Sequence, residues 1–193
     1  MGLQRDNNGN RYILTVIDVF SKYAWSVPVK NKDKKSIREA FKLVLTSATP
    51  LKPERLQTNI EKIIFNREFM GLMTINAIHH FGCENDQKAA VVERFNRTFK
   101  TRIWTYLSAK RTKRWVVALP AILKSYNGSY HRSIGMAPNK VTIDYQDLIW
   151  TRLYKDGDTY FKRHRKVENG AKLRISRVKG VFDKGYMPNW SSE

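Results

Sequence analysis

The residues best suited to chemistry lie in one segment, residues 89–100, where a single carboxylate is followed by several cations. The spacing of apolar residues predicts a helix here, and one stripe of that helix would combine an acid, two cations and an indole. The residues of this stripe are Glu93, Arg97, Lys100 and Trp104. Carboxylates hold divalent metal ions and cations contact phosphates, so the stripe is suited to phosphoryl chemistry on DNA. The alternative is an ordinary surface helix with a Glu93–Arg97 pair one turn apart.

The charge of the chain indicates a polyanionic partner. Its 193 residues include 36 Lys and Arg against 17 Asp and Glu, which gives a formal net charge of +19 and a pI near 10.1. The excess is uneven, because residues 94–193 carry a net +15 and residues 1–93 a net +4. The basic half begins next to Glu93, and this favours nucleic acid as the partner.

The composition disfavours several classes of protein. No run of about 20 apolar residues could cross a bilayer and no short apolar leader follows a basic start, so we expect a soluble intracellular protein, located in the nucleus. We expect neither a membrane nor a small molecule as its partner. The single cysteine, Cys83, excludes a multi-cysteine zinc site, and no zinc is expected. His79 and His80 are adjacent in an extended segment and would point to opposite faces, which argues against a shared metal site.

The elements that must position the segment follow a mixed α/β order. Runs rich in β-branched and aromatic residues predict strands at residues 12–17, 23–29, 55–58 and 78–81. Helical spacing predicts one helix after Asp33 and others at residues 67–75, 86–108 and 112–126. Asn85 or Asp86 is the expected N-cap of the long helix. Pro120 is expected to kink or restart the following helix, and residues 136–138 open a last helical segment with Val141 and Ile143.

Four ordered blocks of the chain form a recognisable set: residues 12–25 (YILTVIDVFSKYAW), 55–58 (RLQT), 91–98 (VVERFNRT) and 125–138 (SYNGSYHRSIGMAP). Together they resemble the catalytic core of the retroviral-type DDE integrases, most closely the integrases of Maverick/Polinton transposons. Residues 173–176 and 182–190 are similar to the C-terminal module of the same integrases. The resemblance implies an α/β, RNase H-like fold, here a mixed sheet truncated at its N-terminal side, with flanking helices. It also implies a site of two aspartates and a glutamate that holds two Mg²⁺ ions.

The resemblance transfers this triad only in part. Its glutamate falls on Glu93, and its second aspartate falls on Asn59, at the end of a short strand, with 33 residues between the two. An amide keeps the shape of aspartate but not its charge, and it is a poor replacement for a carboxylate at Mg²⁺. The loop after Asn59 also departs from the family pattern, because Glu61 and Ile63 stand where glycine and glutamate are usual.

The first aspartate of the triad lies, in the family, on a strand before residues 12–17, and this chain starts just beyond that point. Asp18 is a candidate substitute, with a role in a turn as the default interpretation, and Glu84 and Asp86 are weaker candidates. A single glutamate cannot hold two metal ions. Mg²⁺ is the cofactor that the resemblance implies, but Mg²⁺-dependent strand transfer is expected to be lost.

The cations of the segment are better preserved than its acids. In related retroviral integrases, basic residues one and two turns after the glutamate contact DNA, and Arg97 and Lys100 occupy those places. Such contacts go to phosphates and fade steeply with added salt. Further contributors are expected to be Arg94, Arg102, Lys110, Arg111, Lys113 and Arg114. The basic run at residues 162–166 is a second candidate, and a homodimer through the core is a further expected partnership.

Resemblance and composition together predict three parts: a core-like domain at residues 1–145, a basic linker at 146–170 and an incomplete SH3-like module at 171–193. Residues 171–176 alternate as a strand does, and the glycines that follow suit the start of a small β-barrel. Too few strands remain to bury a face, so the tail is expected to be poorly ordered or docked on the core.

Several functional hypotheses remain open. The favoured one is a transposon-derived integrase core that is catalytically defective and still binds DNA, because the matched blocks run through the chain while one of three triad carboxylates remains. The second is an active recombinase that uses other acids such as Asp18. The third is a non-enzymatic structural or regulatory protein that binds DNA or RNA through its basic surface. A decayed gene fragment without a role is the fourth.

Overall fold

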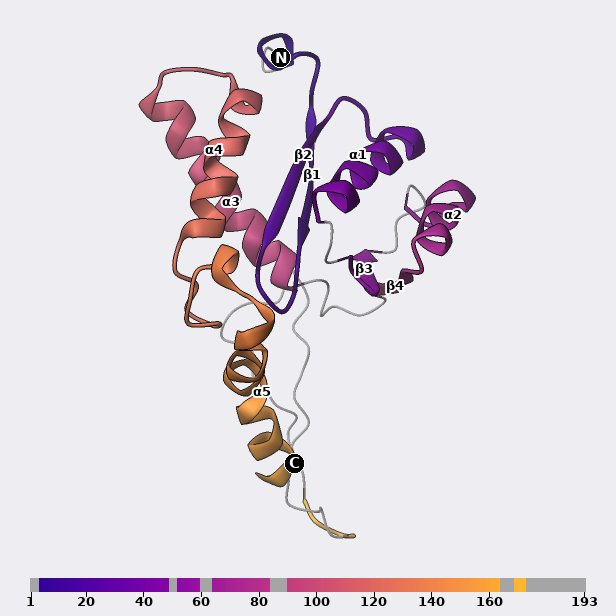
Figure 1. Cartoon of the computed structure of the whole chain (residues 1–193), viewed down its shortest axis with the longest axis vertical. Helices are drawn as coiled ribbons and strands as arrows, with labels where there is room; N and C mark the ends of the chain where they lie inside the picture. Colours follow the sequence, from indigo (N-terminus) through magenta and orange to yellow (C-terminus); the bar gives the residue numbers. More distant parts are fainter. Residues whose placement is uncertain (1–3, 49–51, 60–63, 84–89, 164–168, 173–193) are drawn as a thin grey trace. The chain divides into compact units, whose positions relative to one another are not determined.

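The computed structural model describes residues 4–48, 52–59, 64–83, 90–163 and 169–172. The chain forms two compact units, residues 1–153 and residues 154–193. The four strands and the four helices that carry or flank the candidate site all lie in the first unit (Figure 1).

Two short ladders make up the sheet of the first unit. β1 (Tyr12–Ile17) and β2 (Ala24–Val29) pair antiparallel, while β3 (Arg55–Asn59) and β4 (His79–Cys83) pair parallel. Among the described residues β1 pairs only with β2, β3 pairs only with β4, and no Cα atom of β1 lies within 8 Å of one in β3. Paired strands lie about 4.8 Å apart. The mixed sheet expected from the sequence is therefore divided into two separate ladders.

Four helices cover these ladders. α1 (Lys34–Ser47) contacts the β1–β2 ladder and also α2 (Arg67–Ile75), which packs on β4. α3 (Ala90–Ala109) contacts β1, and α4 (Trp115–Gly128) contacts β2. Figure 1 shows α1 on one side of the β1–β2 ladder and the pair α3 and α4 on the other. The first unit thus has a helical layer on each side of this ladder.

β1 lies between two hydrophobic cores. Ile13 and Ile17 pack against the core between α3 and α4, whereas Leu14 and Val16 pack against the core of α1 and α2. Successive side chains of a strand point to opposite faces, so an unbroken apolar run can serve both cores at once. This explains why the strand is apolar at nearly every position.

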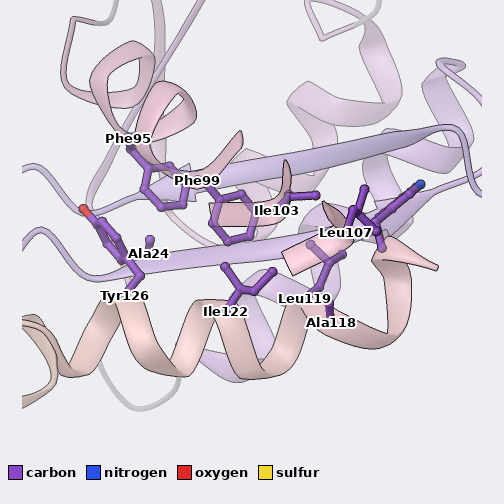
Figure 2. Close-up of a cluster of buried hydrophobic side chains, with 10 residues drawn as sticks. Ala24, Phe95, Phe99, Ile103, Leu107, Ala118, Leu119, Ile122 and Tyr126 are labelled. Atoms are coloured by element: carbon purple, nitrogen blue, oxygen red, sulfur yellow. The ribbon is translucent and has the colours of Figure 1, made fainter. Parts of the chain in front are cut away.

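The core between α3 and α4 fixes how α3 is rotated (Figure 2). Phe95, Phe99 and Ile103 of α3 point toward Ile122 and Tyr126 of α4. The ring centroid of Phe95 lies 5.1 Å from that of Phe99 and 4.8 Å from that of Tyr126. The other buried members of this core are Ala24, Leu107, Trp115, Ala118 and Leu119. Because the apolar stripe of α3 is held inward, its polar stripe must face solvent.

α4 is one uninterrupted helix, and the restart predicted at Pro120 does not occur. Buried residues on both sides of the proline, Leu119 and Ile122, hold the helix against α3. Their packing compensates for the backbone hydrogen bond that a proline removes from the helix interior.

The start of α4 is capped by a residue distant in sequence. Asn7 is buried, its Nδ2 donates to the Lys113 carbonyl at 2.8 Å, and its Oδ1 accepts from the Val116 N–H at 3.0 Å. Arg114, at the N-cap position, makes no capping bond with its own side chain. Asn7 thus supplies a partner for a helix-end N–H that would otherwise lack one.

The chain after α4 differs from the sequence expectation. In place of one helical segment from residue 136, two 3₁₀ turns form at Pro138–Lys140 and Ile143–Tyr145, and the Ile143 side chain is exposed. α5 then spans Gln146–Arg163, so much of the expected linker is helical. Glu84, the predicted N-cap residues Asn85 and Asp86, and the predicted module from residue 173 onward lie outside the described residues.

Candidate nucleic-acid interface

The polar stripe predicted for residues 93–104 exists on the solvent side of α3. Glu93, Arg97, Lys100 and Trp104 are all exposed, and at about 100° per residue they fall within a sector of about 60°. Arg94 is also exposed but lies to one side of this sector. α3 therefore presents a carboxylate at its first turn, two cations on the next turns and an indole beyond them.

The cations of this stripe have no acidic counterpart in the described part of the chain. The ion pairs observed there involve Arg38 and Lys42, which contact Glu39 and Glu68 on α1 and α2. No described carboxylate lies within ion-pair distance of Arg97 or Lys100. Uncompensated cations on one helix face create a positive potential that attracts phosphate groups.

Arg102 is the exception among the basic residues of α3. Its guanidinium donates to the hydroxyl groups of Ser125 and Ser129, each at 3.3 Å, and lies 5.6 Å from the ring centroid of Tyr126. The side chain is half-buried against α4. These contacts give Arg102 a role in joining α3 to α4, in addition to the predicted role in DNA contact.

The connection between α3 and α4 carries the remaining predicted cations. Lys110, Arg111, Lys113 and Arg114 are all exposed, and Arg111 has a left-handed backbone with φ of +46°. The backbone of this connection is held in place by the bond from Asn7 to the Lys113 carbonyl. The four cations therefore extend the positive charge of α3 beyond its C-terminal end.

The residues matched to the triad do not form a metal centre. Asn59 is the last residue of β3, as predicted, and both Asn59 and Glu93 are exposed. No group of three or more His, Cys, Asp or Glu residues suited to a metal ion occurs among the described residues. One carboxylate and one amide are a poor donor set for Mg²⁺, which is bound through carboxylate oxygens and waters. The described residues therefore do not fit a pair of Mg²⁺ ions.

Asp18, the candidate substitute acid, is engaged in the turn between β1 and β2. Its Oδ1 accepts from the Phe20 N–H at 3.3 Å, and its Oδ2 accepts from the Ser21 N–H at 2.8 Å and from the Ser21 hydroxyl. The Asp18 carbonyl also accepts from the Lys22 N–H at 2.9 Å. Both carboxylate oxygens are thus used in closing the turn.

A basic cluster that sequence reasoning did not identify lies beside this turn. Lys22 is only 8% exposed, adopts a left-handed backbone with φ of +60°, and donates from Nζ to the Val19 carbonyl at 2.5 Å. Burial lowers the pKa of Lys22, Asp18 opposes this shift and Arg94 adds to it. Burial also lowers the pKa of His131, and the charges of Lys22 and Arg94 lower it further.

Hydrogen bonds join the strands and helices that carry or flank the three members of this basic cluster. Thr15 of β1 donates to Asn96 Oδ1 on α3 at 2.8 Å, and Ala24 of β2 is bonded to Asn127 on α4. Lys22, Arg94 and His131 come from three distant segments of the chain. No local pattern in the sequence could have indicated that the charges of Lys22 and Arg94 act on His131.

The two adjacent histidines separate as predicted. His79 is exposed, whereas His80 is buried with its Nε2 2.8 Å from the Thr58 hydroxyl and its ring stacked on Phe65 at 4.4 Å. Burial lowers the pKa of His80, and His79 lowers it further. His80 is thus a core residue that links β4 to β3.

The layered arrangement, with a glutamate in the first turn of a long basic helix, defines a class of fold. The chain has the RNase H-like α/β fold of retroviral integrase catalytic cores. The catalytic core domain of the HTLV-2 integrase, solved in complex with magnesium, matches with a TM-score of 0.58 and 19% identity, over 67% of this chain and 82% of that chain. A chain of the simian T-cell lymphotropic virus intasome matches with a TM-score of 0.61 and 17% identity, over 86% of this chain and 54% of that chain.

Relatives in sequence come from transposons. The chain is 30% identical to an uncharacterized transposon-derived protein of Caenorhabditis elegans over 190 residues, which cover 98% of this chain and 63% of that protein. It is 28% identical to the retrovirus-related Pol polyprotein from transposon 412 of Drosophila melanogaster over 130 residues, 65% of this chain and 10% of the polyprotein. The chain thus spans less than two thirds of either relative. No family model matches it.

No helix among the described residues is both long enough and apolar enough to cross a bilayer.

Proposed function

We propose that this chain is a nucleic-acid-binding protein of transposon-integrase origin, and that it holds the phosphate backbone of DNA along α3. The observation that carries the proposal is the exposed stripe of Arg97 and Lys100, without a described acidic partner, on a helix whose rotation is fixed by the buried core. Phosphate contacts of this kind supply affinity without reading sequence. The net charge of +19 favours the same partner.

The proposal includes the loss of strand transfer. Asn59 replaces a carboxylate with an amide at the matched position, and the described residues supply no cluster of acids near Glu93. Two-metal catalysis needs carboxylates to hold both ions against the attacking and leaving oxygens. In this chain Mg²⁺ would act only as a counterion. The HTLV-2 core domain, by contrast, was solved in complex with magnesium.

Three finer parts of the proposal rest on likeness alone. They are descent from Maverick/Polinton integrases, a homodimer formed through the core, and residence in the nucleus beside DNA. The HTLV-2 core domain was solved in a trimeric and a dimeric form, which supports self-association of this fold in a relative.

A salt series tests the DNA interface. The affinity for a fluorescent duplex is measured by anisotropy between about 50 and 200 mM salt, a range over which several phosphate contacts cost orders of magnitude in affinity. The variant Arg97→Gln/Lys100→Gln is expected to bind more weakly and to reduce the slope of log K against log salt by about 2. The control is Lys42→Gln, which removes a cation already paired with Glu39 at 3.2 Å.

Two outcomes would contradict the proposal. Binding that hardly changes with salt would exclude phosphate contacts as its source. Loss of affinity that is equal in the α3 variant and in the Lys42 control would place the interface elsewhere. An RNA competitor of the same length that displaces the duplex at lower concentration would favour the RNA-binding alternative over DNA.

A further inference from the structure

We infer that Trp104 is a stacking platform for an unpaired nucleobase, so that the protein prefers DNA with a single-stranded end over a blunt duplex. This inference rests on the proposed function and specifies the form of nucleic acid that α3 would bind. It is carried by the exposure of the indole, by its place on the basic stripe and by the small residues around it.

Most of the Trp104 side chain is in contact with solvent. Its side chain is 60% exposed, and no hydrogen bond or ring contact to it occurs in the described part of the chain. Two other tryptophans behave differently, because Trp115 is buried in the core between α3 and α4 and Trp25 lies with its ring centroid 4.9 Å from that of Tyr23. A large apolar ring left in water is expected to have a partner outside the chain.

The position of Trp104 indicates the chemistry of that partner. Helical geometry places it within about 40° of both Arg97 and Lys100 around the axis of α3, two turns beyond Arg97 and one turn beyond Lys100. Tryptophan and arginine also occur at protein–protein interfaces, but two cations without a described acidic partner beside the indole favour a polyanion. A polyanion that also carries flat aromatic groups satisfies both features, and nucleic acid is that kind of partner.

The surroundings leave room for a base to stack. Apart from Lys100, the exposed neighbours of Trp104 on α3 are the small hydroxyl residues Thr101, Thr105 and Ser108. In a duplex both faces of a base are covered by its neighbours, whereas a base in a single-stranded end has a free face. The ring would therefore take up an unpaired base, while Arg97 and Lys100 hold the phosphates next to it.

The test compares three DNA molecules at one salt concentration: a blunt duplex, the same duplex with a short single-stranded end, and the same single-stranded end built from abasic nucleotides. The abasic end keeps every phosphate and removes only the bases. The wild-type protein is expected to bind the single-stranded end about fivefold or more tightly than the abasic one. Trp104→Ala is expected to abolish this difference, so that it binds the single-stranded end and the abasic end with equal affinity.

Two variants serve as controls. Trp104→Phe keeps an aromatic face and should retain most of the preference. Trp150→Ala removes an indole of nearly the same exposed fraction, 59%, from α5 and should leave the preference intact. Thermal melting of each variant confirms that the exposed substitutions leave the fold in place.

The remaining outcomes separate this inference from the proposed function. A wild-type protein that binds all three DNA molecules equally overturns the stacking role and leaves DNA binding standing. A wild-type protein that binds none of them overturns the proposed function as well. Trp104→Ala that changes the oligomeric state, measured by light scattering, and keeps the preference for unpaired bases would make Trp104 a protein contact and overturn the inference.

Discussion

Asn127 of α4 exchanges two hydrogen bonds with the backbone of Ala24 in β2. The Ala24 N–H donates to Asn127 Oδ1 at 2.9 Å, and Asn127 Nδ2 donates to the Ala24 carbonyl at 2.9 Å. Asn127 is only 4% exposed and Ala24 is fully buried, so neither backbone group can turn to water instead. The side chain amide of Asn127, on the neighbouring helix, thus supplies hydrogen-bond partners for both backbone groups of Ala24 in β2.

Replacing this amide should cost more stability than its size suggests. Asn127→Ala leaves a buried donor and a buried acceptor of Ala24 without partners, and the free energy of unfolding is expected to fall by about 2 to 4 kcal/mol. Urea unfolding followed by circular dichroism measures this change. Asn139→Ala, at an exposed asparagine, is the control and should stay within about 0.5 kcal/mol of the parent. Equal losses of unfolding free energy in the two variants would show that the two hydrogen bonds between Asn127 and Ala24 do not contribute to stability.

Substitutions at Arg102 and at Arg97 should have different effects, the first on the stability of the fold and the second on the affinity for DNA. Arg102→Lys keeps the charge but loses the planar fork shared between Ser125 and Ser129, so we expect a loss of about 1 kcal/mol in stability and little change in DNA affinity. Arg97→Lys keeps the phosphate contact and should change neither quantity much. Arg97→Ala should weaken DNA binding without affecting stability, which the same urea and anisotropy measurements will show. A large loss of affinity in Arg102→Lys would mean that this guanidinium contacts DNA directly.

Strand transfer should be absent. With labelled DNA ends and Mg²⁺, the purified chain is expected to yield no joined product, because Glu93 has no described acidic partner to help hold two ions. Asn59→Asp is expected to remain inactive, because the described residues would then supply only two of the three triad carboxylates. Efficient joining by the parent chain, abolished by Asp18→Asn, would instead support an active recombinase that uses Asp18.

The buried histidine predicts how stability depends on pH. The pKa of His80 is lowered in the fold by burial, so the unfolded chain, with an ordinary histidine pKa of about 6.5, binds more protons at mildly acidic pH. The stabilisation is therefore fully present above about pH 6.5 and declines as the pH falls below it. His131, whose pKa is lowered in the same direction, adds to the effect.

Urea midpoints at pH 7.5 and pH 5.5 measure this dependence. His80→Gln should be less stable at pH 7.5 and should show a smaller drop on acidification, because one of the two titrating groups is gone. His79→Gln is the matched comparison, because it removes only the smaller cause of the lowered His80 pKa and should reduce the drop by less than His80→Gln does. A drop in His80→Gln as large as in the parent would assign the pH dependence to other groups.

Local patterns predicted most of the elements of the first unit. The β-branched run at residues 12–17 became β1 within its predicted bounds, and the strand that ends at Asn59 was placed correctly. The apolar spacing that predicted the α3 helix is provided by Phe95, Phe99 and Ile103, whose burial determines which face of α3 is exposed. These features follow from side chain periodicity, which is written in neighbouring residues.

Features that depend on distant contacts could not be predicted. The division of the sheet depends on which strands pair, and the capping of α4 depends on Asn7, more than 100 residues away. The continuity of α4 through Pro120 depends on packing against α3. α5 runs through a basic segment that the composition assigned to a linker, because charge content alone does not exclude a helix.

The sequence predicted which residues of the candidate site share one face of α3, but it did not predict the contacts that these residues make. The exposed stripe of α3 is where its sequence placed it, and the roles in DNA contact stay predictions. The contact of Arg102 with α4 and the proximity of Lys22, Arg94 and His131 were missed, because each joins segments that only the fold brings together.

The divided sheet has a practical consequence for handling this protein. β1 and β3 each have an edge on which no described residue pairs, and an open edge can capture a strand from another molecule. Mutual repulsion between copies that each carry a net +19 opposes this, over a range of about 10 Å at 0.1 M salt. Added salt is therefore expected to weaken the proposed binding to DNA and also to reduce the charge repulsion that opposes aggregation. Ionic strength is thus the storage condition on which the lifetime of a sample is expected to depend most.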